Sequence, residues 1–382
     1  MPALSLFDQM SLPKTELERQ LLSRIMRDGP IPFRDFMQAA LYDPDMGYYN
    51  TARAKIGPEG DYYTSSNVHP AFGAVLARAL VELWQSSPAG KEPLTILEAG
   101  AGTGRLAFDI LSALRDEHGH IFERLNYLID EVSPAMRARQ KDQLAAFSGR
   151  VGWQGNGFDQ YRGDAILFSN ELIDAMPVHR VRMHRGRIEE GYVAARQDAN
   201  GEARLSMIWD KVSSERIIQY IERLGASLLE GQIVEVNLDA LDYLKRAANA
   251  INEGYAVTID YGDLAAHLWS ADRAEGTLRS FYRHRLSGSP LERPGEQDIT
   301  ASVNFTALIE YGRDFGLEKV SYERQSSFLI RMGLIDRVGE IYAGSDAVDD
   351  LRERLLIKNL FVPGGVSDNF RVLIQKKRAS GA

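Results

Sequence analysis

The sequence contains no cysteine, and this absence excludes several kinds of chemistry at once. A chain without thiols has no disulfide framework, no thiolate zinc site and no cysteine nucleophile. Its 7 histidines show no spacing typical of metal ligands, so we expect no metal. The lack of disulfides suits a reducing compartment. We therefore expect a cytoplasmic protein, or a mitochondrial matrix protein if the source is eukaryotic.

Long apolar runs and long basic blocks are missing as well. No stretch reaches the roughly 18 consecutive apolar residues of a membrane span, so none is expected. The first 14 residues lack the basic and apolar regions of a signal peptide. The net charge is −8, and the basic run Lys376-Lys377-Arg378 is short, so we expect no nucleic-acid partner.

From Leu94 onward, apolar runs of strand length alternate with segments of helical periodicity. The predicted strands are Leu94–Ala99, Leu125–Asp130, Asp164–Ser169 and Tyr255–Gly262, with helices at Leu106–Leu114, Pro134–Leu144 and Phe305–Phe315. This alternation predicts βαβ units and a doubly wound, mainly parallel α/β sheet. Two more strands are expected at Glu318–Glu323 and Phe370–Lys376. The last is a candidate for an antiparallel strand, because a loop-rich connection precedes it.

The segments around this core suggest three parts. Residues 1–85 read as a helical extension with a tyrosine-rich loop, and residues 179–254 as an insertion on the substrate side, made of short strands followed by helices. Residues 86–178 and 255–382 then form the cofactor-binding domain.

The strongest local signal is Glu98-Ala-Gly-Ala-Gly-Thr-Gly-Arg, which follows a predicted strand and opens a helix. Glycines let the backbone approach a ligand closely, and the helix start offers free N–H groups. A dinucleotide fingerprint would need glycine at Arg105, and no Walker lysine is present. The E-x-G-x-G-x-G form is that of methyltransferases, so Glu98, Gly100, Gly102, Thr103 and Gly104 are candidates for binding S-adenosylmethionine.

A ribose-binding acid is expected at the end of the next strand, roughly 30 residues after the loop. Asp130 and Glu131 both stand there, and two adjacent residues of a strand point to opposite sides. We favour Glu131, although both could be ordinary surface acids. Asp159 in the following loop is a candidate for the adenine amino group, but Asp is also a common turn residue.

The methyl acceptor should lie near the ends of the next two strands. Asn170, a candidate cofactor ligand, is followed by Glu171 and Asp174, whose spacing of three places them on one face of a helical turn. Two carboxylates could hold a guanidinium bidentately, or could only complement a helix dipole. Asp260 is a third candidate acid. His284 could act on substrate, although a structural role for a lone histidine is the better expectation.

Taken together, these motifs resemble the MidA-like family, which includes the mitochondrial complex I assembly arginine methyltransferase. The resemblance is carried by Gly29-Pro-Ile, Leu41-Tyr-Asp-Pro, Gly47-Tyr-Tyr, the glycine loop, Glu131-Val-Ser-Pro, Asn170-Glu-Leu-Ile-Asp-Ala-Met-Pro-Val, Ile259-Asp-Tyr-Gly, Gly276-Thr-Leu-Arg and His284. It implies a class I methyltransferase fold. For the mitochondrial member it implies symmetric dimethylation of an arginine on a subunit of NADH dehydrogenase.

The leading interpretation is therefore a protein arginine methyltransferase that uses S-adenosylmethionine and binds a protein substrate. One alternative is a small-molecule methyltransferase. Another is a protein that binds S-adenosylmethionine and assists assembly without catalysis; retention of Glu171, Asp174 and Asp260 speaks against it.

Overall fold

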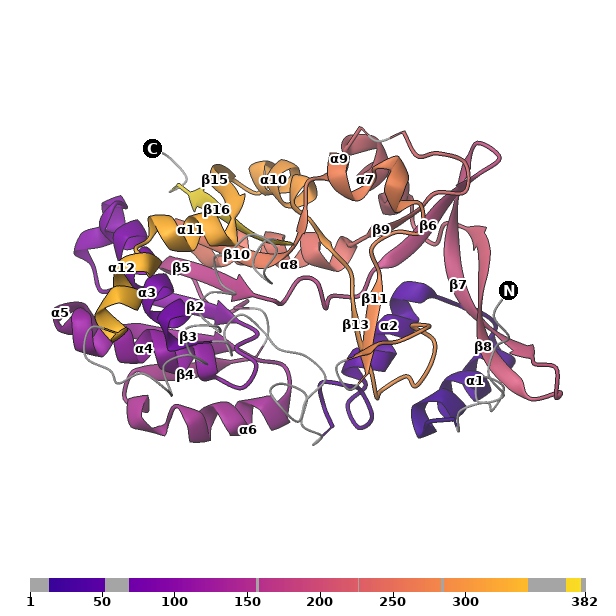
Figure 1. Ribbon diagram of the computed structural model, residues 1–382, viewed down its shortest axis with the longest axis horizontal. Coiled ribbons are helices and arrows are strands. Elements are labelled where there is room, and N and C mark those ends of the chain that lie inside the picture. Colours follow the sequence, from indigo (N-terminus) through magenta and orange to yellow (C-terminus); the bar gives the residue numbers. More distant parts are fainter. Residues whose placement is uncertain are drawn as a thin grey trace.

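The structure is a computed structural model that describes residues 14–51, 69–155, 158–225, 227–282, 285–342 and 369–378. His284 and much of the tyrosine-rich loop lie outside these residues. Figure 1 shows two lobes along the longest axis, one built on a large sheet and the other on the chain's first helices and a second sheet.

The large sheet has the strand order β15-β16-β10-β5-β2-β3-β4, with β14 beside β10. Its strands are β2 Thr95–Ala99, β3 Asn126–Asp130, β4 Val151–Gln154, β5 Gly163–Asn170, β10 Ile251–Asp263, β14 Val303–Asn304, β15 Leu317–Arg324 and β16 Phe370–Lys377. From β4 to β10 all neighbours are parallel. The chain runs outward from β2 to β4 and then returns to β5 on the other side. This confirms the predicted doubly wound α/β fold and places a topological switch point at the ends of β2 and β5.

Strand β16 is antiparallel to both β10 and β15, as the loop-rich connection suggested. Several short strands were not predicted, among them β4 and β9 (Ile233–Val236). The four residues of β4 are mostly half-buried and carry no clear alternation. The four residues of β9 lie in a stretch expected to be helical, where only pairing with β6 makes them a strand.

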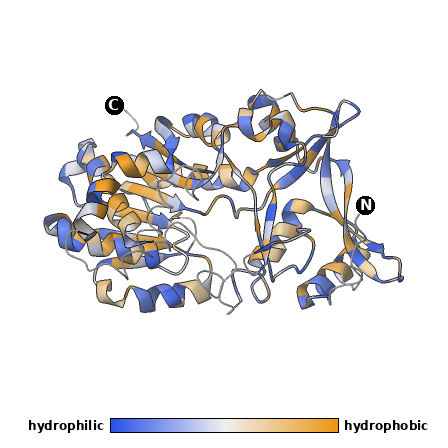
Figure 2. Cartoon of the chain, in the orientation of Figure 1, coloured by the Kyte–Doolittle hydropathy of each residue, from blue (hydrophilic) through white to orange (hydrophobic). Residues whose placement is uncertain are grey.

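The faces of the large sheet are covered by different helices. Ile96, Ile166 and Phe168 face a core with α3 (Pro70–Gln85) and α4 (Arg105–Glu117). Their neighbours Leu97 and Leu167 face a core with α8 (Leu238–Ala250) and α10 (Phe305–Asp314). This alternation follows from the two-residue period of a strand. Each fully buried Leu or Ile contributes about 1.5–3 kcal/mol. Figure 2 shows hydrophobic residues concentrated on these central strands.

The second sheet is antiparallel throughout and contains β1 (Ile31–Pro32), β6 (His179–His184), β7 (Arg187–Gln197), β8 (Ala203–Lys211) and β9. Helices α1 (Glu16–Asp28) and α2 (Phe33–Tyr42) share a core with it, and α7 (Glu215–Arg223) packs nearby. A small sheet of β11 (Arg279–Tyr282), β12 (Arg285–Leu286) and β13 (Asp298–Thr300) lies beside α2.

The predicted division into three parts stays a proposal. The second sheet draws on both the N-terminal extension and the predicted insertion, whereas α8, inside the insertion, packs on the large sheet. The remaining helices are α5 Gly119–Phe122, α6 Pro134–Gln143, α9 Ala265–Leu268, α11 Gln325–Arg331, α12 Leu334–Tyr342, η3 Pro88–Lys91, η4 Ala145–Phe147 and η5 Ala271–Arg273. None of the helices in the described ranges has the length and hydropathy to cross a bilayer.

Candidate functional site

The glycine loop connects β2 to α4 and bends through left-handed backbone at all three glycines. The φ values are 67° at Gly100, 53° at Gly102 and 82° at Gly104, a region that other residues rarely adopt. The Gly100 N–H donates to the Asp130 carbonyl at 2.9 Å, which joins the loop to the end of β3. A Cβ atom at Gly100 would lie 2.7 Å from Cδ1 of Leu172, so the acceptor-side segment also packs against this turn.

Glu98 lies at the end of β2 beneath the loop and is 2% exposed. The Tyr127 hydroxyl donates to its Oε2 at 2.7 Å. Burial raises the pKa of Glu98 to about 7, the nearby Glu131 adds to this, and the Tyr127 hydrogen bond opposes it. Glu98 can therefore hold a proton near neutral pH, or accept a hydrogen bond from a cationic ligand as the carboxylate.

Glu131 follows β3 and is buried, with both carboxylate oxygens engaged. Its Oε1 accepts from the Ser133 N–H at 2.8 Å, and its Oε2 accepts from Nε2 of Gln140 at 2.9 Å. Burial raises the pKa of Glu131, and these two hydrogen bonds oppose that shift. Each oxygen keeps a second lone pair, which could accept a hydroxyl of a ribose. The next residue, Val132, is 66% exposed and also borders the cavity described below.

The turn after β5 carries the acids predicted for the acceptor. Glu171 has φ 52°, unusual for a side-chain-bearing residue, and its carboxylate accepts from Nδ2 of Asn170 at 3.2 Å. Asp260, at the end of β10, accepts from the backbone N–H groups of Leu172 (3.2 Å), Ile173 (2.8 Å) and Tyr261 (2.8 Å). Asp260 is fully buried, and its hydrogen bonds to Leu172 and Ile173 stabilise the conformation of the turn.

A second group of acids lies beside two tyrosines of the N-terminal segment. Burial, together with Asp260, Glu171 and Asp298, raises the pKa of Asp174 well above its ordinary value. The Tyr49 hydroxyl donates to Asp298 at 2.9 Å, and the Tyr42 hydroxyl donates to the Ala175 carbonyl at 3.1 Å. The centroids of the two rings lie 5.4 Å apart, so Tyr42 and Tyr49 form a tyrosine wall next to the carboxylates.

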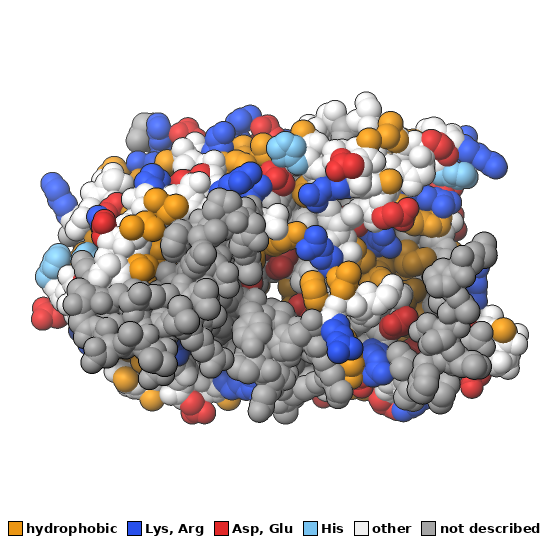
Figure 3. All heavy atoms as spheres, in the orientation of Figure 1, with side chains coloured by type: hydrophobic (Ala, Val, Ile, Leu, Met, Phe, Trp, Pro, Cys, Tyr) orange, Lys and Arg blue, Asp and Glu red, His pale blue; other side chains and the backbone are white. Residues whose placement is uncertain are grey.

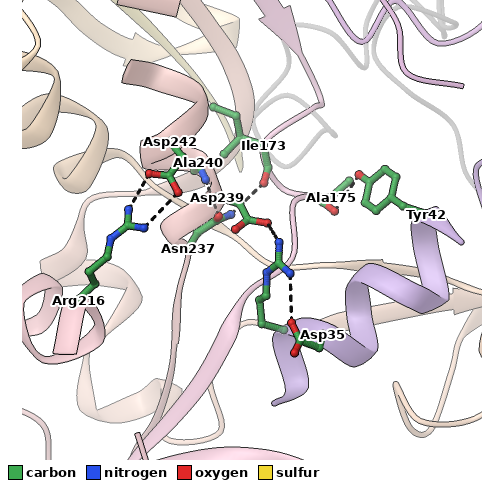
Figure 4. Close-up of polar contacts among 10 residues, drawn as sticks. Asp35, Tyr42, Ile173, Ala175, Arg216, Asn237, Asp239, Ala240 and Asp242 are labelled. Carbon is green, nitrogen blue, oxygen red and sulfur yellow. Dashed lines mark hydrogen bonds and ion pairs between the residues drawn. The ribbon is translucent and has the colours of Figure 1, made fainter. Parts of the chain in front are cut away.

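One cavity of about 520 Å³ connects the glycine loop, the end of β3, the turn after β5 and the tyrosine wall. Residues of α2 and α8 also line it. Figure 4 shows polar contacts made by these two helices. There Nη2 of Arg34 binds Asp239 at 2.6 Å, and the same guanidinium reaches Asp35 at 3.1 Å. Asn237 caps α8 through Ala240 (2.8 Å) and donates to the Ile173 carbonyl at 3.2 Å. This contact ties α8 to the turn after β5.

Among the described residues that line this cavity, acidic side chains outnumber basic ones. Glu98, Asp130, Glu131, Glu171, Asp239 and Asp242 line it, against Arg34, Arg105 and Arg246. Arg34 is paired with Asp239 and Arg105 with Asp109. By contrast, Figure 3 shows acidic and basic side chains interspersed over the described part of one outer face. The cavity thus favours a cationic ligand more than the surrounding surface does.

Comparison with known proteins identifies the family to which the chain belongs. Over residues 75–322, well over half of the 382 residues, the sequence matches the model of a family of S-adenosyl-L-methionine-dependent methyltransferases. The chain belongs to this family. Its enzymes are S-adenosylmethionine-dependent methyltransferases, so the cofactor expected from the glycine loop is confirmed.

This methyltransferase has similar proteins of known name and structure. It is 26% identical to human mitochondrial protein arginine methyltransferase NDUFAF7, over 97% of this chain and 86% of that protein. With the Danio rerio protein of the same name the identity is 27%, over 86% and 79%. A crystal structure from Burkholderia thailandensis, bound to S-adenosyl-homocysteine, superposes with a TM-score of 0.85 at 30% identity and covers 97% of both chains.

The residues at the methyltransferase cavity fit its cofactor. The three glycines at positive φ keep side chains away from the loop, and the helix start of α4 faces the cavity. A volume of about 520 Å³ is within the usual range for a site that holds a cofactor-sized molecule. Glu131 offers carboxylate lone pairs, and the exposed Val132 offers an apolar surface beside it.

The structure brings most of the predicted site residues of this methyltransferase to the cavity. Its lining includes Glu98, Gly100, Gly102, Thr103, Glu131, Asn170 and Glu171. Gly104 and Asp174 are not among the lining residues but are next in the chain to Thr103 and Ala175, which are. Asp260 accepts from the N–H of the lining residue Leu172, whereas Asp159 is exposed and is not in the lining. His284 lies outside the described residues. The individual roles of all these residues stay predictions, and so does the absence of a metal.

Several cavity residues were not predicted, among them Arg34, Tyr42, Tyr49 and Asp239. The two tyrosines belong to motifs that carry the family resemblance, Leu41-Tyr-Asp-Pro and Gly47-Tyr-Tyr, which was an available signal. Arg34 and Asp239 are separated by 205 positions, and no local pattern could have paired them.

Proposed function

We propose that this methyltransferase transfers a methyl group to a side-chain nitrogen of arginine in a protein. The observation that carries the proposal is the position of Glu171, whose carboxylate borders the cavity beside the cofactor loop on a backbone held at φ 52°. The acidic lining supports a cationic acceptor, and the name of the relatives, protein arginine methyltransferase, supports arginine.

For the cofactor, we propose that the backbone of Gly100, Gly102, Thr103 and Gly104 holds the methionine part and that Glu131 accepts the ribose hydroxyls. Glu98, 2% exposed at the base of the loop, would accept from the cofactor's amino group. Asn170 would contact the cofactor from the end of β5. Bound S-adenosylmethionine supplies an electrophilic methyl group on a sulfonium. For Asp159 an adenine contact would need the exposed loop to approach the cavity.

At the acceptor, Glu171 would orient the guanidinium so that one nitrogen points along the line of transfer. The new N–C bond would form as the methyl–sulfur bond of the sulfonium breaks, with the bonding pair staying on the sulfur of the departing S-adenosylhomocysteine. The nitrogen would release one proton, which a carboxylate at Glu171 can accept. Asp174, whose pKa is raised by burial and by its acidic neighbours, favours its protonated form without ligand. A bound guanidinium would favour the carboxylate form, which would then add negative potential at the acceptor. Asp260 would act as a positioning residue, since its hydrogen bonds in the described part of the chain come from backbone N–H groups of the turn and of Tyr261. His284 stays a candidate substrate contact.

By the family resemblance, the protein substrate would be a subunit of a respiratory NADH dehydrogenase, methylated during complex assembly. The relatives named above are mitochondrial. A bacterial protein of this kind would work in the cytoplasm, and a eukaryotic one in the mitochondrial matrix.

Transfer of labelled methyl from S-adenosylmethionine into an extract of the source cells tests the proposal. Four proteins are compared: wild type, Gly102→Val, Glu171→Gln, and Glu222→Gln as an exposed control on α7. We expect methylarginine in one protein band with wild type and the control. Gly102→Val should lose cofactor binding, because φ 53° suits glycine. Glu171→Gln should keep cofactor binding and lose at least roughly 100-fold in rate, the scale of one removed electrostatic partner.

Two outcomes would contradict the proposal. Label found only in small molecules would indicate a small-molecule acceptor. No label despite tight cofactor binding, in extracts from cells lacking the gene, would favour a binding protein without catalysis.

A further inference from the structure

Gln140, on α6, lies behind the cofactor cavity and contacts two parts of the chain that border it, the glycine loop and Glu131. The side chain is 0% exposed and does not line the cavity. Its Nε2 donates to the Gly102 carbonyl at 2.8 Å and to Oε2 of Glu131 at 2.9 Å. One buried amide therefore bridges the glycine loop and the predicted ribose acid, which are 29 residues apart in the chain.

The orientation of this amide is determined by Trp153 on β4. The indole Nε1–H, which is only a donor, lies 3.0 Å from Oε1 of Gln140. The amide oxygen must face the indole, so both amide N–H groups face the Gly102 carbonyl and Glu131. Both polar heavy atoms of the Gln140 amide have partners, and a flipped amide would mismatch all three contacts in a buried position.

The main chain of α6 is close to the loop as well. A Cβ at Gly104 would lie 3.3 Å from Cα of Gln140, so the last glycine allows α6 to pack directly on the loop. Ser133, which caps α6 through Met136 at 3.3 Å, also gives its backbone N–H to Glu131. The helix thus supports the same carboxylate at its first turn and at Gln140.

We infer that Gln140 is a positioning residue for the cofactor, holding the Glu131 carboxylate and the Gly102 carbonyl at a set separation, with Trp153 selecting the orientation of its amide. It acts through Glu131 and the loop, because it is sealed from the cavity. The inference rests on the proposed role of Glu131 and goes beyond it, since no motif or comparison assigns Gln140 or Trp153.

Binding of S-adenosylhomocysteine, measured by calorimetry on the full chain, is the test. Gln140→Leu keeps the volume of the side chain but removes its donors, and we expect the Kd to rise roughly 10-fold to 100-fold, the scale of buried groups left unpaired. Trp153→Phe should raise the Kd by roughly 3-fold to 10-fold, because the amide loses the donor that orients it. Gln143→Leu makes the same replacement at an exposed position of α6 and should bind like wild type.

A second variant, Gln140→Glu, gives a readout that lost packing would not produce. The charged groups that face Glu131 are Asp130, Arg137 and Glu98, and Tyr42 is also near. In wild type, burial holds the pKa of Glu131 above its ordinary value, so cofactor affinity should rise with pH as Glu131 ionises. With Gln140→Glu two carboxyl groups must share a proton, and their repulsion after its loss should make affinity fall as pH rises from 6 to 9.

The outcomes separate this inference from the proposed role of Glu131. If Glu131→Ala binds as tightly as wild type, the assignment of Glu131 is wrong. If Glu131→Ala weakens binding while Gln140→Leu and Gln143→Leu behave alike, Gln140 has no positioning role. The same conclusion follows if Gln140→Glu keeps the pH dependence of wild type. Circular dichroism of each variant shows whether it is folded.

Discussion

Glu98 joins the cofactor loop to the interior of the large sheet. It combines nearly complete burial with one hydrogen bond among the described residues, from Tyr127. A carboxyl group in such a place favours its protonated form, because burial penalises the charge. The residue can thus serve a ligand and at the same time limit the stability of the protein without ligand.

This environment predicts a pH-dependent stability. Burial raises the pKa of Glu98 from 4.5 to about 7. Between these values the folded protein holds a proton that the unfolded chain has lost, so the free energy of unfolding should fall as pH rises from about 4.5 to 7. The loss should be on the order of 3 kcal/mol. Urea unfolding of the cofactor-free protein at pH 5, 6 and 7 measures it.

In Glu98→Gln this part of the pH dependence should disappear, because the amide does not titrate and can still accept from Tyr127. Glu123→Gln, at an exposed position before β3, is the matched control and should follow wild type. If the free energy of unfolding falls equally with pH in wild type and in Glu98→Gln, Glu98 is ionised in the folded protein throughout this range.

At the scale of elements, the important unit is the turn after β5, whose shape depends on the neighbouring strand. Three backbone N–H groups converge on Asp260 of β10, and the Glu171 N–H donates to the Ile259 carbonyl at 2.9 Å. These bonds hold Glu171 at a positive φ that would otherwise be costly. The parallel pairing of β5 with β10 therefore prepares the acceptor side of the cavity.

Asp260→Asn should disturb this turn. One amide N–H₂ group would replace an oxygen that now accepts backbone N–H groups, so at least one buried donor loses its partner. We expect methyl transfer to slow by roughly 10-fold or more. The Kd for S-adenosylhomocysteine should change far less, since the glycine loop is held by β3 and α6. Asp272→Asn, at an exposed position, serves as the control. If Asp260→Asn transfers methyl groups as fast as this control, Asp260 does not position the turn for catalysis.

At the scale of the whole molecule, the two sheets meet across the cavity through α2 and α8. The Arg34–Asp239 pair, with exposed fractions of 28% and 26%, connects them, and Tyr42 adds its bond to Ala175. Arg216 of α7 binds Asp242 at 3.2 Å and 2.7 Å on the same helix, α8. Since α8 also packs on the large sheet, it links the second sheet to the cavity wall.

The Arg34–Asp239 contact should be worth more than an ordinary surface pair. In a double-mutant cycle with Arg34→Met and Asp239→Asn we expect a coupling energy of about 1–2 kcal/mol in urea unfolding. The pair Arg78–Glu82 on α3, with exposed fractions of 54% and 51%, should give about 0.3–0.5 kcal/mol in the matched cycle. A coupling no larger than this control would mean that the two lobes are joined mainly by other contacts.

The doubly wound sheet, the glycine loop and most residues that line the cofactor side could be predicted from the sequence. These features depend on local patterns: alternating apolar strands and helices, glycines where φ must be positive, and an acid at the end of the next strand. Chain order and the parallel pairing then place these segments at one edge of the sheet.

Other features depend on contacts between distant segments, and only the tertiary structure decided them. The sequence placed Asp260 near the acceptor, but it did not show that Asp260 accepts backbone N–H groups of the turn after β5. Strand β9 forms because β6 pairs with it, and Arg34 meets Asp239 because the N-terminal helices pack beside α8. The amide of Gln140 joins Glu131 to the loop for the same reason. Local sequence specifies backbone conformation and burial period, whereas the partner of a side chain depends on how whole elements pack.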